Sequence, residues 1–154
     1  TLGLWYPKGS EFDLVGFSSA DYDGDKVDRK STSGHSFLMS GAAISWSSRK
    51  QTCVALSTTE DEYISLGSAC TTGVWLRQLL IDLKQDISEP TLIYEDNQST
   101  ICVTKNLNCH SKLKHVEIKY HYVRDQVEKI FAIIAHYYVV DTTNPNLPFT
   151  IFYN

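Results

Sequence analysis

The hydrophobic and polar pattern of residues 12–56 is typical of β-strands. Apolar and small or polar side chains alternate from Phe12 to Ser19, which predicts a strand with Ser18 and Ser19 on opposite faces. Two further strand-like runs, Ser33–Met39 and Ala42–Ser48, meet at a short hairpin signal, and Arg49–Gln51 reads as a turn after them. The pattern therefore predicts a meander of three antiparallel strands.

The period changes after residue 56 to that of a helix. Ser57-Thr58-Thr59-Glu60 is a capping-box pattern, and the helix that it opens is expected to end near Lys84. One stripe at spacings of three and four predicts the buried face: Leu66, Ala69, Gly73, Leu76, Leu80 and Leu83. Extending the stripe backward by one step reaches Glu62. This carboxylate is either stabilised by the helix N-terminus alone or directed at the sheet for a chemical role.

The second half alternates strands with helices. A short apolar strand is predicted at Thr91–Glu95, and Asp96-Asn97 would cap a brief helix that ends near Lys105. A second helix at about Lys114–Lys129 and a last strand at Phe131–Val140 follow. An aspartate that ends a strand and opens a helix lies where α/β sheets place their ligands, so Asp96 is a candidate site residue.

This order of elements predicts an α/β domain. Three antiparallel strands extended by two strands on helical crossovers give a five-stranded mixed sheet flanked by helices. A length of 154 residues fits one domain, 1–154, in which residues 141–154 form a Pro-rich divergent tail. No apolar run approaches the roughly 20 residues of a membrane helix, and no signal peptide is recognisable, so we expect an intracellular protein of the cytoplasm or nucleus. The absence of an initiator Met suggests a piece of a longer chain.

Charge is unevenly distributed along the chain. The formal net charge is −4, but residues 105–124 carry five cations against one anion. A local basic face suits a phosphate binder, and it is equally compatible with an ordinary solvated helix face. The four cysteines form no C-x-x-C pair, and Cys102, Cys109, His110 and His115 match no recognisable zinc pattern, so we expect reduced thiols.

Five separate runs of residues carry a more specific signal. They are Asp28–Gly34, Ile44–Gln51, Val54–Tyr63, Glu95–Ser99 and Lys114–Ile118. In this order they resemble the ribonuclease H (RNase H) domain of Ty1/copia-type retrotransposon polyproteins, and the resemblance extends over nearly the whole chain. It implies an RNase H-like fold and four carboxylates that hold two Mg²⁺ (or Mn²⁺) ions, which cleave the RNA strand of an RNA–DNA hybrid. Such ions prefer oxygen ligands, and a pair of them activates water and stabilises the leaving oxygen.

Transferred to this chain, the family's site is incomplete. The helix-borne glutamate falls on Glu62 and the aspartate after the fourth strand falls on Asp96, the two residues that the pattern had already marked. The first-strand aspartate falls on Ser19, and the fourth carboxylate falls on Leu147. Two of the four expected metal ligands are therefore replaced.

One nearby carboxylate could compensate for the ligand missing at Ser19. Asp21 shares a strand face with Ser19, but it lies about 7 Å further along, so at best weak binding of one metal ion is expected. Strand alternation predicts that Glu95 faces the opposite side from Asp96.

Two functions follow from the resemblance. A catalytically impaired domain would serve as a nucleic-acid-binding or protein-interaction module, the latter through its apolar end at Ile151–Asn154. The alternative is an Mg²⁺-dependent endonuclease that still cleaves RNA–DNA hybrids with Asp21, Glu62 and Asp96. In either case four basic residues are the expected phosphate contacts: Lys112, Lys114, Lys119 and Arg124.

Overall fold

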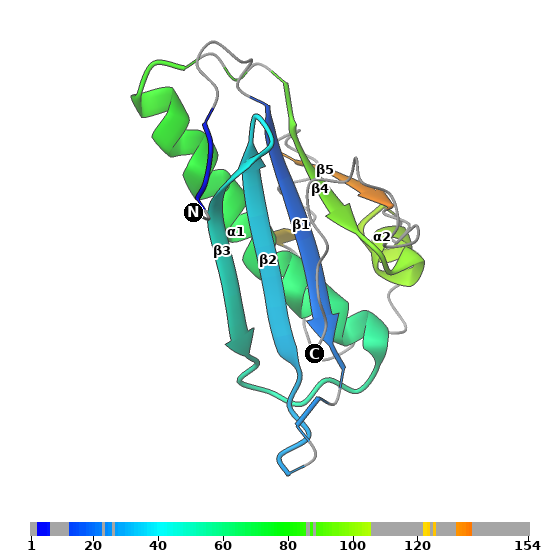
Figure 1. The fold of residues 1–154 in the computed structure, drawn as a ribbon. Coiled ribbons are helices and arrows are strands. Elements are labelled where there is room, and N and C mark those ends of the chain that lie inside the picture. The colour runs from blue at the N-terminus through cyan, green and yellow to red at the C-terminus, as the bar shows by residue number, and fades with distance from the viewer. Residues whose placement is uncertain are drawn as a thin grey trace, which may run out of the picture.

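The computed structural model describes residues 3–6, 13–22, 24–25, 27–85, 87, 89–105, 122–123, 125 and 132–136, the last range as backbone alone. Its elements follow one another along the chain as strands, a long helix, and then strand, helix and strand (Figure 1). They are β1 Leu14–Asp21, β2 Thr32–Met39, β3 Ala42–Lys50, α1 Thr58–Asp82, β4 Thr91–Glu95, α2 Gln98–Lys105 and β5 Ala132–His136.

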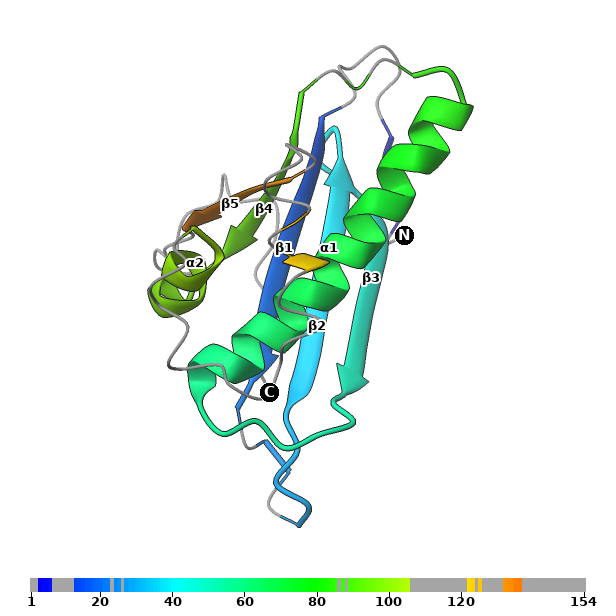
Figure 2. The same ribbon diagram turned by 180° about the vertical axis from the view of Figure 1, so that it is seen from behind.

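The described strands form one mixed sheet in the order β3-β2-β1-β4-β5. β3, β2 and β1 pair antiparallel, whereas β1, β4 and β5 pair parallel. The parallel strands need crossovers, which place α1 along one face of the sheet (Figure 2). In the β1–β4 register Ser18 lies opposite Glu95, so the next position of β1, Ser19, comes level with the end of β4. The predicted α/β class is confirmed.

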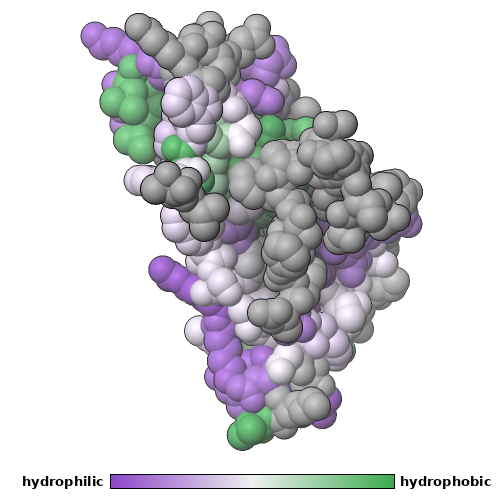
Figure 3. All heavy atoms as spheres, viewed as in Figure 1, coloured by the Kyte–Doolittle hydropathy of each residue, from purple (hydrophilic) through white to green (hydrophobic). Residues whose placement is uncertain are grey.

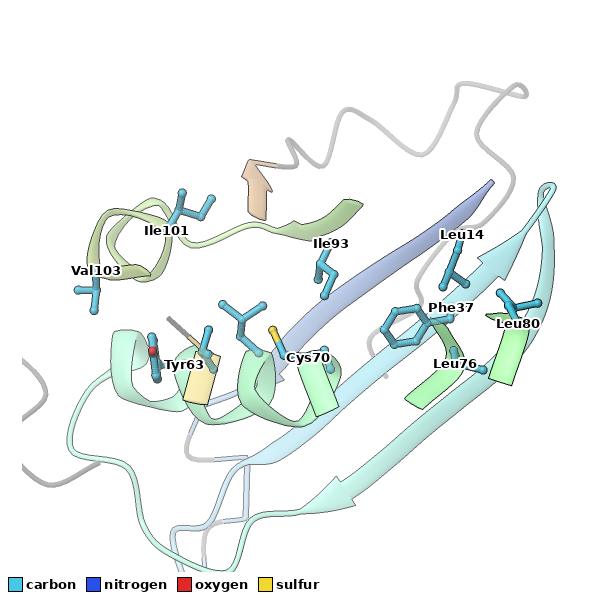
Figure 4. Packing of buried hydrophobic residues seen from close by; sticks show 12 residues of the cluster. Leu14, Phe37, Tyr63, Cys70, Leu76, Leu80, Ile93, Ile101 and Val103 are labelled. Atoms are coloured by element: carbon cyan, nitrogen blue, oxygen red, sulfur yellow. The ribbon is translucent and has the colours of Figure 1, made fainter. Parts of the chain in front are cut away.

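The core lies between α1 and the sheet (Figure 4). Phe37 of β2 and Tyr63 and Leu66 of α1 are completely buried there. The ring of Phe37 lies against two glycines, because a Cβ on Gly16 would be 2.6 Å from the ring and one on Gly73 would be 3.2 Å from it. These two positions let the helix and β1 approach the ring closely.

The start of α1 follows the predicted capping box with one difference. Ser57 is the N-cap, and its hydroxyl accepts a hydrogen bond from the backbone N–H of Glu60 at 3.2 Å. The Glu60 carboxylate accepts from the N–H of Leu56 at 2.8 Å, one residue before the cap. The helix end is therefore fixed immediately before the position of Glu62.

Two details of the sequence prediction are wrong. Arg49 and Lys50 belong to β3, not to a turn, because they pair with Ser33 and Thr32 of β2 and extend the hairpin. Polar residues at an exposed strand end show no hydrophobic alternation, so the predicted strand ended at Ser48, before the end of β3. Leu83 is the C-cap of α1 and is 60% exposed, since the last turn of the helix extends past the sheet.

Apolar surface gathers near that end of α1 (Figure 3). Trp75, Leu79 and Leu83 are exposed there. Within the described residues, no helix combines the length and apolarity of a membrane span.

Several predicted features lie outside the described residues. They include most of the predicted helix Lys114–Lys129 and the tail 141–154. Residues 122, 123 and 125 are helical, and Val123 is fully buried in the core. The predicted last strand is present as β5, with its described part limited to Ala132–His136. The single-domain prediction for 1–154 remains a prediction.

Candidate metal centre

Three carboxylates meet where β4 ends beside the N-terminal part of α1. Glu62 comes from α1, Glu95 is the last residue of β4, and Asp96 follows it. One oxygen from each lies within 4.8 Å of the other two. Glu62 is 8% exposed and Glu95 is 0% exposed, whereas Asp96 is accessible to solvent. The sequence predicted Glu62 and Asp96 as site residues, and the structure brings them together.

The side chain of Glu95 points into this group, which corrects the prediction that it faces away from Asp96. Along β4 the buried positions are Thr91, Ile93 and Glu95, so alternation turns Glu95 toward α1. Asp96 lies beyond the last residue of the strand, where the chain bends, and alternation no longer applies to it. The sequence did contain the signal, because a glutamate occupies the third inward position of an otherwise apolar strand.

Hydrogen bonds hold one side of each buried carboxylate. Glu95 Oε1 accepts from the N–H of Asn97 at 3.2 Å, and Glu95 also accepts from the hydroxyl of Ser18. Glu62 accepts from the backbone N–H of Ala20, at a level of β1 that β4 does not reach. The second oxygens, Glu62 Oε2 and Glu95 Oε2, are buried with no hydrogen-bond partner among the described residues.

Burial and like charge make the site unfavourable for anions alone. Burial, followed by the negative charges of Glu95, Asp96 and Asp61, raises the pKa of Glu62 to about 9. Burial is also the main cause that raises the pKa of Glu95 to about 8, and Asp96 adds to it. Without a cation, the site therefore favours the protonated form of both buried carboxyl groups.

The group fits a divalent cation. Mg²⁺ and Mn²⁺ prefer oxygen ligands, and every donor here is a carboxylate. Two oxygens on opposite sides of Mg²⁺ are about 4 Å apart, and around Ca²⁺ about 5 Å, so a group spanning 4.8 Å needs little adjustment. The unpartnered second oxygens of the buried glutamates provide lone pairs for such an ion.

The strand residues predicted for the site take other positions. Ser18 faces α1, and its hydroxyl lies 3.3 Å from that of Ser65. Ser19 is the next residue, and its backbone carbonyl accepts from the Ser65 hydroxyl at 2.7 Å. Asp21 ends β1, is exposed, and has its carboxylate against Gly24, so it is not a member of the three-carboxylate group.

A further buried acid, Asp61, lies next to the group and was missed in the sequence. It is 0% exposed and accepts a hydrogen bond at 2.6 Å from the side-chain amide of Gln51. Burial raises its pKa, against the hydrogen bonds from Ser31 and Gln51. No periodicity marked Asp61, because the first turns of α1 are buried on all sides.

The remaining predicted site residues lie outside the described residues: Leu147, Lys112, Lys114, Lys119 and Arg124. Within the described part, Lys50 forms ion pairs with Asp25 and Asp28, so its charge is already neutralised.

Comparison with known proteins extends this picture. The chain is 42% identical over 120 residues to the retrovirus-related Pol polyprotein from transposon TNT 1-94 of Nicotiana tabacum, a match that covers 78% of this chain and 9% of that protein. It is 35% identical over 156 residues to the Pol polyprotein from transposon RE1 of Arabidopsis thaliana, covering 99% of this chain and 11% of that protein. The chain thus spans about a tenth of the length of these relatives. No protein-family model matches it.

Among solved structures, LC11-RNase H1 from compost, in complex with an RNA/DNA hybrid, has a similar fold. The TM-score is 0.53 at 11% identity, and the match covers 81% of this chain and 85% of that one. The chain belongs to the retrovirus-related Pol polyproteins of retrotransposons, and it has the fold of an RNase H domain. The resemblance drawn from the five sequence motifs is therefore confirmed, together with the RNase H-like fold.

Proposed function

We propose that this RNase H domain binds nucleic acid, with RNA–DNA hybrids as its preferred ligand, and that its hydrolytic activity is impaired. The observation that carries the proposal is the composition of the carboxylate site. Glu62 and Asp96 are present and close together, whereas the first-strand position holds the neutral Ser19 and the fourth position holds Leu147. Two ions held close together need several anions to offset their charge, so losing two of four carboxylates weakens the two-metal mechanism most.

Binding does not require the complete metal cage. A positively charged face contacts phosphates, and such contacts give affinity without base specificity. Lys112, Lys114, Lys119 and Arg124 are the proposed phosphate contacts. The RNA/DNA hybrid bound by the structurally similar LC11-RNase H1 supports a ligand of this class. The same proposal places the domain inside the cell, in the cytoplasm or nucleus.

A second candidate is an active Mg²⁺- or Mn²⁺-dependent hybrid ribonuclease. It is favoured by the third carboxylate, Glu95, which keeps three anions at the site. Asp21, the substitute considered from the sequence, would have to move from Gly24 to contribute.

One experiment separates the two candidates. The full chain and Asp96→Asn are incubated with a labelled RNA–DNA hybrid and Mg²⁺ or Mn²⁺, and binding and cleavage are measured on the same samples. We expect binding by both proteins and no cleavage above the Asp96→Asn background. Cleavage that the full chain performs and Asp96→Asn abolishes would establish the ribonuclease instead.

Salt dependence tests the proposed phosphate contacts. Log affinity should fall linearly with log salt concentration, and replacing Lys114 by Gln should reduce that slope by about one. The matched control is Lys84→Gln, an exposed lysine after the end of α1. An affinity that does not change with salt concentration would favour a protein partner over nucleic acid.

A further inference from the structure

The strongest unassigned feature is the buried carboxylate of Glu95. It is 0% exposed, and its Oε2 has no partner among the described residues. Burying a charged or polar group without a partner costs free energy, so this side chain should have moved outward or gained a partner if it were only structural. It instead lies in a group with two other carboxylates.

The surroundings fix the direction of Glu95. The Asn97 N–H and the Ser18 hydroxyl bind it on one side, as hydrogen-bond donors around a metal site hold a ligand in its orientation. Oε2 is not used by these bonds, and Glu62 presents an equally buried and unpartnered Oε2. Glu62 and Glu95 thus each bring a buried oxygen without a described partner to a group of carboxylates that reach within 4.8 Å of one another, which suits a cation.

We propose that Glu95 is a ligand of one divalent cation, bound together with Glu62 and Asp96, and that it replaces the carboxylate missing at Ser19. Ser18 and Glu95 are paired neighbours on β1 and β4 and Ser19 is the next residue of β1, so the two positions are close to one another along the sheet. In this arrangement the third anion comes from β4 rather than from β1. The ion is Mg²⁺ or Mn²⁺ by ligand type.

This inference deepens the proposed function at the same site, but it does not depend on nucleic-acid binding. A single ion at this position neutralises the buried carboxylates and can contact a phosphate oxygen. A second ion would lack the carboxylates that are absent at Ser19 and Leu147.

The test measures Mn²⁺ binding to the full chain. Binding is monitored through the decrease of the electron paramagnetic resonance signal of free Mn²⁺. We expect one ion per chain, and Glu95→Gln should weaken binding about tenfold or more, as should Glu62→Gln. Glu89→Gln makes the same change at an exposed position just before β4 and should leave affinity within about twofold of the unaltered chain. Unchanged or tighter Mn²⁺ binding by Glu95→Gln, or two ions per chain, would overturn the proposal.

A second variant covers the case in which Glu95→Gln does not fold. Glu95→Cys replaces a hard ligand by a soft thiolate, so it should lose Mn²⁺ and gain Cd²⁺ with cadmium–thiolate absorption in the ultraviolet. The unaltered chain and Glu89→Cys provide the background from the exposed Cys53 and Cys102. No additional Cd²⁺ site in Glu95→Cys would contradict the proposal.

Hybrid binding in EDTA, measured on the same proteins, keeps the two proposals separate. Mn²⁺ binding that requires Glu95 supports this inference even if no hybrid binds. Hybrid binding without a Glu95-dependent ion supports only the proposed function.

Discussion

At the residue scale, the composition of the carboxylate site depends on which strand supplies a negatively charged side chain. Glu62 and Asp96 stand where a helix stripe and a strand end predicted them, and Glu95 joins them from the inward face of β4. Ser19 carries only a hydroxyl, which is a neutral and weaker ligand than a carboxylate.

Restoring the first-strand anion should increase catalysis. In Ser19→Asp we expect Mg²⁺-dependent cleavage of an RNA–DNA hybrid to appear, because an added carboxylate strengthens binding of the ions that activate water. Gel analysis of a labelled RNA strand measures it. Ser48→Asp, at an exposed position of β3, is the matched control and should give no gain. A folded Ser19→Asp without cleavage would argue against the assignment of Ser19 as the replaced ligand.

At the element scale, the position of Glu62 depends on how α1 is held against the sheet. The ring of Phe37 lies between Gly16 of β1 and Gly73 of α1, so the spacing of strand and helix is set by the absence of two side chains. At the other end, Arg77 ties α1 to the segment before β4. Both contacts fix the helix relative to the strand that carries Glu95.

Filling the space at Gly16 should destabilise the domain. A Cβ there would lie 2.6 Å from the Phe37 ring, and overpacking of this kind costs about 1–3 kcal/mol. Urea unfolding of Gly16→Ala measures it, with Gly34→Ala as control, where the new Cβ would have only contacts of 3.7 Å or more. Gly16→Ala combined with Phe37→Leu should cost less than the sum of the two single changes. Additive costs would show that the ring is not the obstacle.

Removing the guanidinium of Arg77 should loosen the connection to β4. Arg77 donates to the carbonyls of Glu89 at 2.6 Å and Ile87 at 3.1 Å, and to the Thr91 hydroxyl at 3.1 Å. Arg77→Met keeps the apolar stem and should lower the free energy of unfolding by about 2 kcal/mol. Gln78→Met, on the exposed side of the same helix turn, should change it by less than about 0.5 kcal/mol. Equal effects of the two variants would contradict the anchoring role.

At the scale of the whole molecule, the buried acids link stability to pH and to cations. The folded-state pKa values of Glu62 and Glu95, about 9 and about 8, lie above the ordinary value of 4.5. In the metal-free chain the folded state therefore binds more protons than the unfolded state above about pH 4.5. Asp61, with a raised pKa, acts in the same direction. His35 opposes them, because burial lowers its pKa and its unfolded state takes up the extra proton.

In EDTA, the free energy of unfolding should consequently fall as the pH rises from about 5 to about 8. Urea unfolding at several pH values measures this slope. Glu62→Gln removes one of the responsible groups, so the slope should become smaller, whereas His35→Gln should make it steeper. Stability that does not change, or rises, over this range would contradict the assignment.

Adding Mn²⁺ should raise the stability at pH 8 more than at pH 5, because the cation replaces protons on the buried carboxylates. The same unfolding measurements with and without Mn²⁺ test it, with Mn²⁺ kept well above its dissociation constant. Equal stabilisation at both pH values would indicate that the ion binds elsewhere.

The sequence by itself determined the α/β class, the order of strands and helices, the capped start of α1 and two of the three clustered carboxylates. Periodicity and capping report local geometry, and these features are local. Only the tertiary structure decided that Glu95 joins the group, that Asp21 stays against Gly24, and that Asp61 is buried. Strand alternation marks Glu95 as an inward residue, but the meeting of these groups depends on the register of β1 with β4 and on the approach of α1 to the sheet, which are contacts between segments distant in the chain.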